Sequence, residues 1–200
     1  MDTLTSNIYC FFKDNKLTDF TLIVGNKDIN VHSLVIAEKS DVFKAEIMSN
    51  SKETKKCLIE DFDEETVQSG IKFMYSLSLE NERCTPDLLR FANKFYIKSL
   101  FNFLENYLVK IVNLSNIKDY LFIAEKVNAH KLLKECMNLI RKNEDVFMDK
   151  EYLTTLDDCI VMKMISLFNK FTISENDEKP DECKKNLFEN IHQLILEISK

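Results

Sequence analysis

Apolar residues near the start of the chain change from a helical spacing to short strand-like runs. Ile8, Phe11 and Phe12 recur at the i, i+3 and i+4 positions of one helix face. The run Phe20–Val24 is rich in β-forming residues, and the run Ile29–Val31 follows it after a glycine-containing turn. We therefore predict a short N-terminal helix followed by a β-hairpin.

Mixed helix and strand patterns continue to about residue 110. Acidic residues follow several polar residues that are good helix N-caps, and such pairs mark the starts of helices. The pattern predicts, in order, a short helix from Ser33, a helix capped by Ser40, a strand over Cys57–Ile59, a helix capped by Asp63 and helices from Asp87 onward. This part of the chain is thus an α+β fold with a small three-stranded sheet flanked by helices.

Beyond Asn113 the pattern is helical only. Ser115 is a good N-cap, and apolar stripes at helical spacing follow it. We expect an all-α extension over residues 113–173, with two short helices between Met148 and Lys170. Residues 174–186 begin with a polar, charged run and predict a linker, and residues 187–200 predict a C-terminal amphipathic helix.

Composition excludes several classes of function. Two Gly and two Pro in 200 residues favour a mostly helical protein with short connections. The net charge of −6 at pH 7 disfavours binding to a phosphate backbone, so we expect no nucleic-acid partner. No apolar run approaches the roughly 18 residues that a membrane span needs, so we expect no membrane partner.

The six cysteines are scattered, with no CxxC pair and none beside a His at ligand spacing. We expect no metal site and no cofactor. The N-terminus has no basic region followed by an apolar run, so no signal peptide is expected. We interpret the cysteines as reduced apolar residues of an intracellular protein, cytoplasmic or nuclear.

The order and spacing of several segments resemble the BTB/POZ domain, in particular its speckle-type branch. The resemblance covers residues 1–110, and residues 113–147 are similar to the helical extension (3-box or partial BACK) that follows the domain in that branch. The segments that carry the resemblance are Leu17–Phe20, Val31-His32, Ala37–Phe43, Ile71–Tyr75, Leu88–Phe95 and, in the extension, Leu114-Ser115 with Phe122–Glu125. The resemblance implies a protein-interaction module.

The first activity that the resemblance implies is homodimerisation. By position, Ile8, Phe11 and Val35 match the apolar dimer contacts of the family, and Phe12 lies beside them. A helix with two adjacent Phe residues is more apolar than a free surface helix usually is. The alternative is that these side chains pack only on their own domain.

The second implied activity is recruitment of a cullin-3-type E3 ubiquitin ligase. Cullin-binding members carry a hydrophobic-x-Glu motif after the third helix, and the matching positions here are Ser51-Lys52-Glu53. Ser51 replaces the apolar anchor, and Ile47 or Met48 is the candidate substitute. The alternative is a BTB self-association scaffold or regulator without a ligase role.

Asp19 and His32 resemble a catalytic pair only superficially. The resemblance implies that they are buried groups that satisfy each other or nearby backbone, as buried charges require. No nucleophile with a base and an orienting acid stands out, so we expect no enzyme and no catalytic residues. The sequence names no substrate or client protein.

Overall fold

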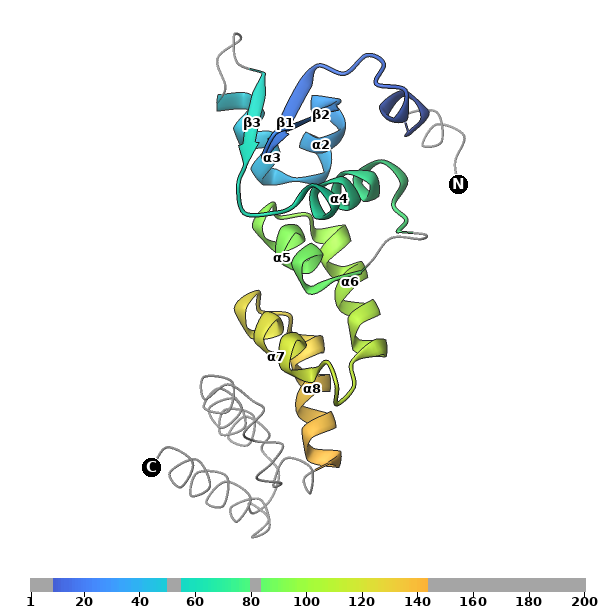
Figure 1. Cartoon of the computed structure of the whole chain (residues 1–200), viewed down its shortest axis with the longest axis vertical. Helices are drawn as coiled ribbons and strands as arrows, with labels where there is room; N and C mark the ends of the chain where they lie inside the picture. The colour runs from blue at the N-terminus through green and yellow to red at the C-terminus, as the bar shows by residue number, and fades with distance from the viewer. Residues whose placement is uncertain (1–8, 50–54, 80–83, 144–200) are drawn as a thin grey trace. The chain divides into compact units, whose positions relative to one another are not determined.

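The computed structural model describes residues 9–49, 55–79 and 84–143. The chain divides into two compact units, residues 1–111 and 112–200, which are described separately. After a helical turn at residues 9–13 the elements are β1 (Phe20–Val24), β2 (Lys27–Val31), α2 (Ser33–Lys39), α3 (Asp41–Ser49), β3 (Lys56–Ile59), α4 (Glu64–Ser76), α5 (Pro86–Lys94), α6 (Lys98–Ile111), α7 (Ile117–Lys126) and α8 (His130–Lys142) (Figure 1).

The sheet has the order β2-β1-β3, with β1 antiparallel to β2 and parallel to β3. β1 alternates buried and half-buried residues, so one face of the sheet lies against the core. Gly25 takes a φ of 57°, the positive value that two-residue hairpin turns need at their first central position. The predicted hairpin is confirmed, and β3 begins one residue earlier than expected, at Lys56.

Ser40 connects α2, α3 and α5. Its hydroxyl accepts a hydrogen bond from the Phe43 N–H at 3.0 Å, which caps α3 as predicted, and it donates to the carbonyl of Phe95. The Phe43 ring stacks on the Phe95 ring with centroids 4.5 Å apart. One buried serine and one ring pair therefore join the helices after the hairpin to the end of α5.

α4 lies at the centre of the first unit, packed against α2 and against α5 and α6 (Figure 1). Asp63 caps it as predicted, accepting from the Thr66 N–H at 2.7 Å. Gly70 faces the Phe91 ring so closely that an added Cβ would overlap the ring. Gly70 therefore allows α4 and α5 to pack closely, although glycine is less favourable than alanine inside a helix.

Aromatic residues around α5 and α6 are only partly buried. We expect all of them in the core from their helical spacing, and Phe91 and Phe95 are buried. Tyr96 is exposed, and Phe103 is partly exposed although its ring contacts the Phe73 ring. The prediction was wrong for Tyr96, because α5 ends just before it and the residue takes a positive φ of 52°. It was also wrong for Phe103, which is 39% exposed on α6.

In the second unit, α7 and α8 pack on each other through the predicted stripes. The predicted N-cap, Ser115, was wrong: α7 begins at Ile117, and the Ser115 hydroxyl instead donates to the Asn113 side chain at 2.5 Å. Asn113 thus holds Ser115 in a local turn. The helices expected between 148 and 170, the linker 174–186 and the C-terminal helix 187–200 lie outside the described residues.

We predict that Gly70→Ala destabilises the first unit despite the better helix propensity of alanine. The methyl group must displace the Phe91 ring, which costs about 1–3 kcal/mol in a packed core. Urea unfolding would measure this loss. Gln68→Ala, on the exposed side of α4, is the control and should be nearly neutral, and Phe91→Leu should rescue part of the Gly70→Ala effect.

Candidate interaction surfaces

The Tyr75 hydroxyl joins the N-terminal segment, the start of α2 and α4. It accepts a hydrogen bond from the His32 backbone N–H at 2.8 Å and lies 2.9 Å from His32 Nδ1. His32 Nε2 lies 2.8 Å from the carbonyl oxygen of Lys16. Because that carbonyl can only accept, Nε2 carries the proton and Nδ1 accepts from the Tyr75 hydroxyl.

The Tyr75 hydroxyl is buried and stays protonated. Burial raises the pKa of Tyr75 to about 12, although the hydrogen bond from His32 acts in the opposite direction. The Phe12 ring stacks on the Tyr75 ring, with centroids 4.5 Å apart and planes 16° apart. Tyr75 therefore holds the N-terminal segment through its ring and, by way of His32, through its hydroxyl.

Asp19 and His32 do not pair with each other. Asp19 accepts hydrogen bonds from the Ser33 backbone N–H at 2.7 Å and from the Ser33 hydroxyl at 2.6 Å. Partial burial raises the pKa of the Asp19 carboxyl, but the Ser33 hydrogen bonds outweigh it and the pKa lies below its ordinary value. Asp19 is exposed and His32 is half-buried, so the expectation that both are buried was wrong.

The residues predicted to form the dimer surface differ in exposure. Phe11 is 42% exposed, Val35 is half-buried, and Phe12 packs on Tyr75 within its own domain. Ile8 lies outside the described residues. The sequence reasoning missed Leu17 and Leu34, which are 80% and 81% exposed.

The predicted cullin-binding residues lie at the end of α3 and after it. Met48 is 77% exposed, and Ile47 is half-buried. Ser51 and Glu53 lie outside the described residues. An apolar side chain is thus accessible on the last turn of α3, three residues before the position where the family motif has its anchor.

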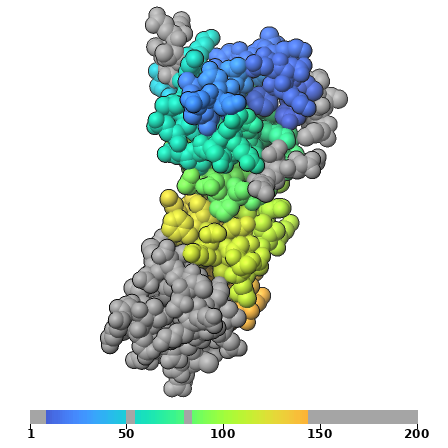
Figure 2. Space-filling model, viewed as in Figure 1, coloured from blue at the N-terminus to red at the C-terminus, as the bar shows by residue number. Residues whose placement is uncertain are grey.

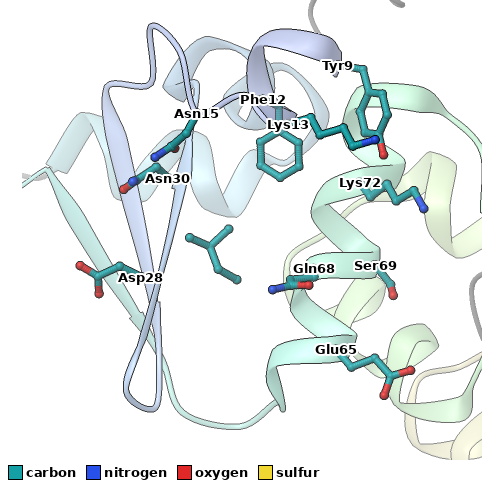
Figure 3. A pocket seen from close by; sticks show the side chains of 11 residues that line it. Tyr9, Phe12, Lys13, Asn15, Asp28, Asn30, Glu65, Gln68, Ser69 and Lys72 are labelled. Carbon is teal, nitrogen blue, oxygen red and sulfur yellow. The ribbon is translucent and has the colours of Figure 1, made fainter.

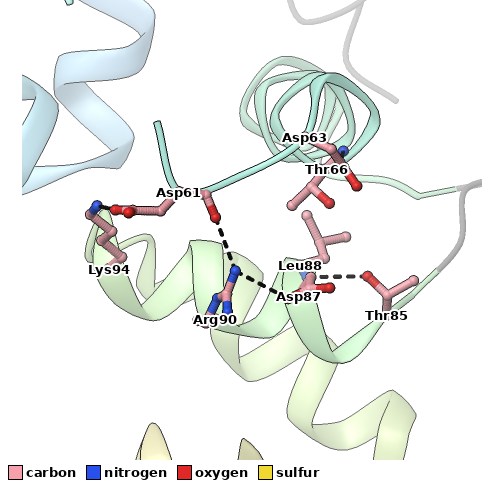
Figure 4. Close-up of polar contacts among 8 residues, drawn as sticks. All are labelled: Asp61, Asp63, Thr66, Thr85, Asp87, Leu88, Arg90 and Lys94. Carbon is pink, nitrogen blue, oxygen red and sulfur yellow. Dashed lines mark hydrogen bonds and ion pairs between the residues drawn. The ribbon is translucent and has the colours of Figure 1, made fainter. Parts of the chain in front are cut away.

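A polar cluster fixes the chain between β3 and α4 to α5 (Figure 4). Arg90 donates to the carbonyl of Asp61 at 3.0 Å, and Lys94 forms an ion pair with the Asp61 carboxylate. The Arg90 guanidinium also lies over the Phe62 ring, 4.9 Å from its centroid. Each of these exposed contacts contributes little stability by itself. Together they hold the chain between β3 and α4 against α5.

A groove of about 530 Å³ opens between the N-terminal segment, β2 and α4 (Figure 3). Phe12 and Lys13 line it from the N-terminal segment, Asn30 from β2, and Glu65 and Lys72 from α4. The space-filling view shows the N-terminal residues (blue) lying against the surface of residues 55–79 (teal) (Figure 2). Sequence patterns gave no signal for this groove, because its three walls are far apart along the chain.

The described residues contain no group of three or more His, Cys, Asp or Glu that would hold a metal ion. Within the same ranges, Cys10, Cys57, Cys84 and Cys136 are free. Burial raises the pKa of the Cys136 thiol to about 12, so this thiol behaves as an apolar core group. No helix among the described residues is long and apolar enough to cross a membrane.

The first unit combines a small mixed sheet covered by helices with exposed apolar side chains and an open groove. The model of the BTB/POZ domain matches residues 9–112. The chain therefore belongs to the BTB/POZ domain family, a family of protein-interaction modules. The expected α+β fold with its three-stranded sheet is confirmed.

Three curated relatives are similar to this chain. Human Rabankyrin-5 is 25% identical over 77% of this chain and 13% of its own length. BTB and MATH domain-containing protein 42 of Caenorhabditis elegans is 29% identical over 64% of this chain and 32% of its own length. Mouse Kelch-like protein 8 is 42% identical over 34% of this chain and 11% of its own length. The chain thus spans less than a third of the length of each relative.

Among solved structures, the BTB domain of zebrafish PATZ1 is similar to this chain. The match covers 54% of this chain and 89% of that domain, with 20% sequence identity and a TM-score of 0.47.

We predict that Tyr75→Phe destabilises the first unit by about 1–3 kcal/mol, because the His32 N–H and Nδ1 both lose their partner while the ring contact with Phe12 remains. Urea unfolding measures the loss. Tyr107→Phe, at an exposed tyrosine of α6, is the matched control. Equal stability of the two variants would contradict the role given to the Tyr75 hydroxyl.

Proposed function

We propose that this chain is a homodimeric BTB adaptor that recruits a cullin-3-type E3 ubiquitin ligase. Membership of the BTB/POZ family supports a role in protein–protein interaction. Dimerisation and cullin binding are the finer parts of the proposal, and each rests on its own surface.

The observation that carries the dimer proposal is a set of exposed apolar side chains around the Lys16–His32 contact. The hydrogen bond between the Lys16 carbonyl and His32 Nε2 brings the N-terminal segment to the start of α2. Leu17 directly follows Lys16, and Leu34 lies two residues after His32. Both leucines are about four-fifths exposed, and such apolar exposure at one place favours burial against a partner.

The backbone of Leu17 supports the same conclusion. Leu17 has a φ of 58°, a left-handed conformation that bulky residues rarely adopt. Such a conformation costs roughly 1 kcal/mol or more and persists where the surroundings require it. Burial of the Leu17 side chain against a second copy would offset part of this cost.

A two-fold dimer would also use the predicted residues Phe11 and Val35. Most homodimers are isologous, so the same patch serves both subunits. Phe12, which packs on Tyr75, would hold the segment that carries Phe11. Ile8, which lies outside the described residues, is the fourth residue that the sequence predicts for this surface.

The cullin proposal rests on α3 and the residues that follow it. Ser51 stands at the position where the family motif has an apolar anchor, and the exposed Met48 would supply an apolar side chain in its place. Glu53 keeps the acidic residue of the motif. Central apolar anchors dominate the energy of small interfaces. Ile47, half-buried beside Met48, would support the anchor.

A scaffold without a ligase role is the second candidate, and Ser51 is the observation that favours it. The chain would then dimerise through the same patch and bind no cullin. In either case, we propose that residues 113–173 form a BACK-like extension and that the client is bound by another protein or by another part of the chain. The proposed setting is the cytoplasm or nucleus, and no enzymatic activity is assigned.

We expect the wild-type chain to be a dimer in light scattering across a dilution series. Phe11→Asp combined with Leu34→Asp should raise the dissociation constant at least about 30-fold, because it places two charges in an apolar interface. Leu58→Asp, at a leucine on β3 that is 57% exposed, is the control and should leave the mass unchanged. A monomeric wild-type chain at all concentrations would refute the dimer.

For the cullin surface, we expect the immobilised N-terminal region of cullin-3 to retain the chain at micromolar concentration. Met48→Asp and Glu53→Lys should each weaken retention at least about tenfold, since each removes a central contact. Leu77→Asp is the control, because Leu77 is exposed at the end of α4 with a φ of 54°, which aspartate tolerates. Absence of binding by the wild-type chain would leave the scaffold as the function.

A further inference from the structure

The groove between β2 and α4 has an open strand edge as one wall. β2 is the outer strand of the order β2-β1-β3, and the described residues place no further strand beside it. In an antiparallel pair, alternate residues direct their main-chain groups toward the partner strand. The two-residue turn makes Val24 and Lys27 the first hydrogen-bonded pair, so Asp28 and Asn30 direct their N–H and C=O groups away from β1.

The opposite wall is one face of α4. Glu65, Gln68 and Lys72 lie at the i, i+3 and i+7 positions of this face and line the groove together with Asp28 and Asn30 (Figure 3). A strand edge that faces a helix across an open groove is the arrangement in which an extended peptide adds as a further strand. The strand edge supplies affinity through main-chain hydrogen bonds, and the helix face supplies specificity.

The charges of the groove are ordered along it. Lys13 and Lys72 lie toward the end where Asn30 is, and Glu65 lies toward the other end (Figure 3). Seven residues separate Glu65 from Lys72, which is about 10 Å along the helix axis. An extended peptide advances about 13 Å over four residues, which is about 3 Å more than the distance from Glu65 to Lys72 along the helix axis. Long charged side chains can bridge this difference in length.

One apolar side chain from the strand lies in the middle of the groove. Ile29 of β2, which is 8% exposed, lines it opposite Gln68 and Ser69 of α4, and Phe12 lies at the Lys13 end (Figure 3). In an extended peptide, residues i, i+2 and i+4 lie on one face. An acidic, an apolar and a basic side chain at these positions therefore match the order of the groove.

We propose that this groove binds an extended peptide segment of a partner protein as an antiparallel strand on β2. The peptide carries an acidic residue, then an apolar residue, then a basic residue at alternate positions. β2 runs from Asp28 to Asn30, so an antiparallel peptide enters at the Lys13 and Lys72 end and leaves toward Glu65. This places the acidic residue first in the peptide sequence. The groove shares Phe12 with the residues predicted for dimerisation, but it contains neither Phe11 nor Leu34, nor the cullin-binding Met48.

The test uses the full chain and a fluorescein-labelled, C-terminally amidated heptapeptide, Thr-Glu-Thr-Val-Thr-Lys-Thr, in a fluorescence-anisotropy titration. We expect saturable binding that is at least about fivefold tighter than that of the reversed sequence, Thr-Lys-Thr-Val-Thr-Glu-Thr, since both charge pairs are lost on reversal. Equal affinities, or no binding at millimolar peptide, would overturn the proposal.

Two further measurements separate strand addition from simple side-chain binding. N-methylation of one alternate set of peptide amides should abolish binding, while N-methylation of the other set is tolerated, because only one set faces β2. The bound peptide should also slow hydrogen exchange of the Asp28 and Asn30 amides. Insensitivity to both N-methylated sets would overturn strand addition.

On the protein side, Gln68→Trp fills the groove from an exposed position and should weaken binding at least tenfold. Asn102→Trp, at an exposed position on α6 outside the groove, is the control and should bind as the wild type does. Both variants should keep the wild-type mass and cullin retention, so failure of the peptide site is distinguished from failure of the adaptor function. An unchanged affinity of Gln68→Trp would place the peptide elsewhere and overturn the proposal.

Discussion

The arrangement of the first unit depends on the hydrogen bonds of one buried hydroxyl group, that of Tyr75. It accepts from the His32 backbone and donates to the His32 ring, and that ring in turn holds the Lys16 carbonyl. Tyr75 lies in the last turn of α4, so a single side chain connects the end of α4 to the strand end and to the N-terminal segment. A buried hydroxyl that loses such partners costs more than an average hydrogen bond contributes, which gives this junction its importance.

This junction supports both the proposed dimer surface and the proposed peptide groove. Phe12 stacks on Tyr75 and lines the groove, whereas its neighbour Phe11 is exposed. The Lys16 contact places Leu17 beside the start of α2. The two surfaces therefore meet at Phe12 and share one structural support, and a change in the position of the N-terminal segment would affect both.

Local patterns in the sequence were enough to predict most of the fold. The hairpin and the caps Ser40 and Asp63 depend on residues close together in the chain, and all three were predicted correctly. The apolar faces of the helices were predicted only in part, because Tyr96 and Phe103 are exposed. The Tyr75–His32 contact joins residues 43 positions apart, and the groove joins three distant segments, so spacing carried no signal for either. The prediction of Ser115 as an N-cap was wrong because its hydroxyl is hydrogen-bonded to the Asn113 side chain instead of to the start of α7. Neither the exposure of Leu17 nor its left-handed backbone conformation could be read from composition or spacing.

The parallel pairing of β1 with β3 has a consequence for the synthesis of the chain. β1 and β2 are joined by a short turn and can pair as soon as both have left the ribosome. β3 follows only after α2 and α3, so one side of β1 stays without its neighbour while those helices are being made. During this interval a nascent apolar strand is open to chaperones or to wrong partners, and the late arrival of four residues, Lys56–Ile59, closes it.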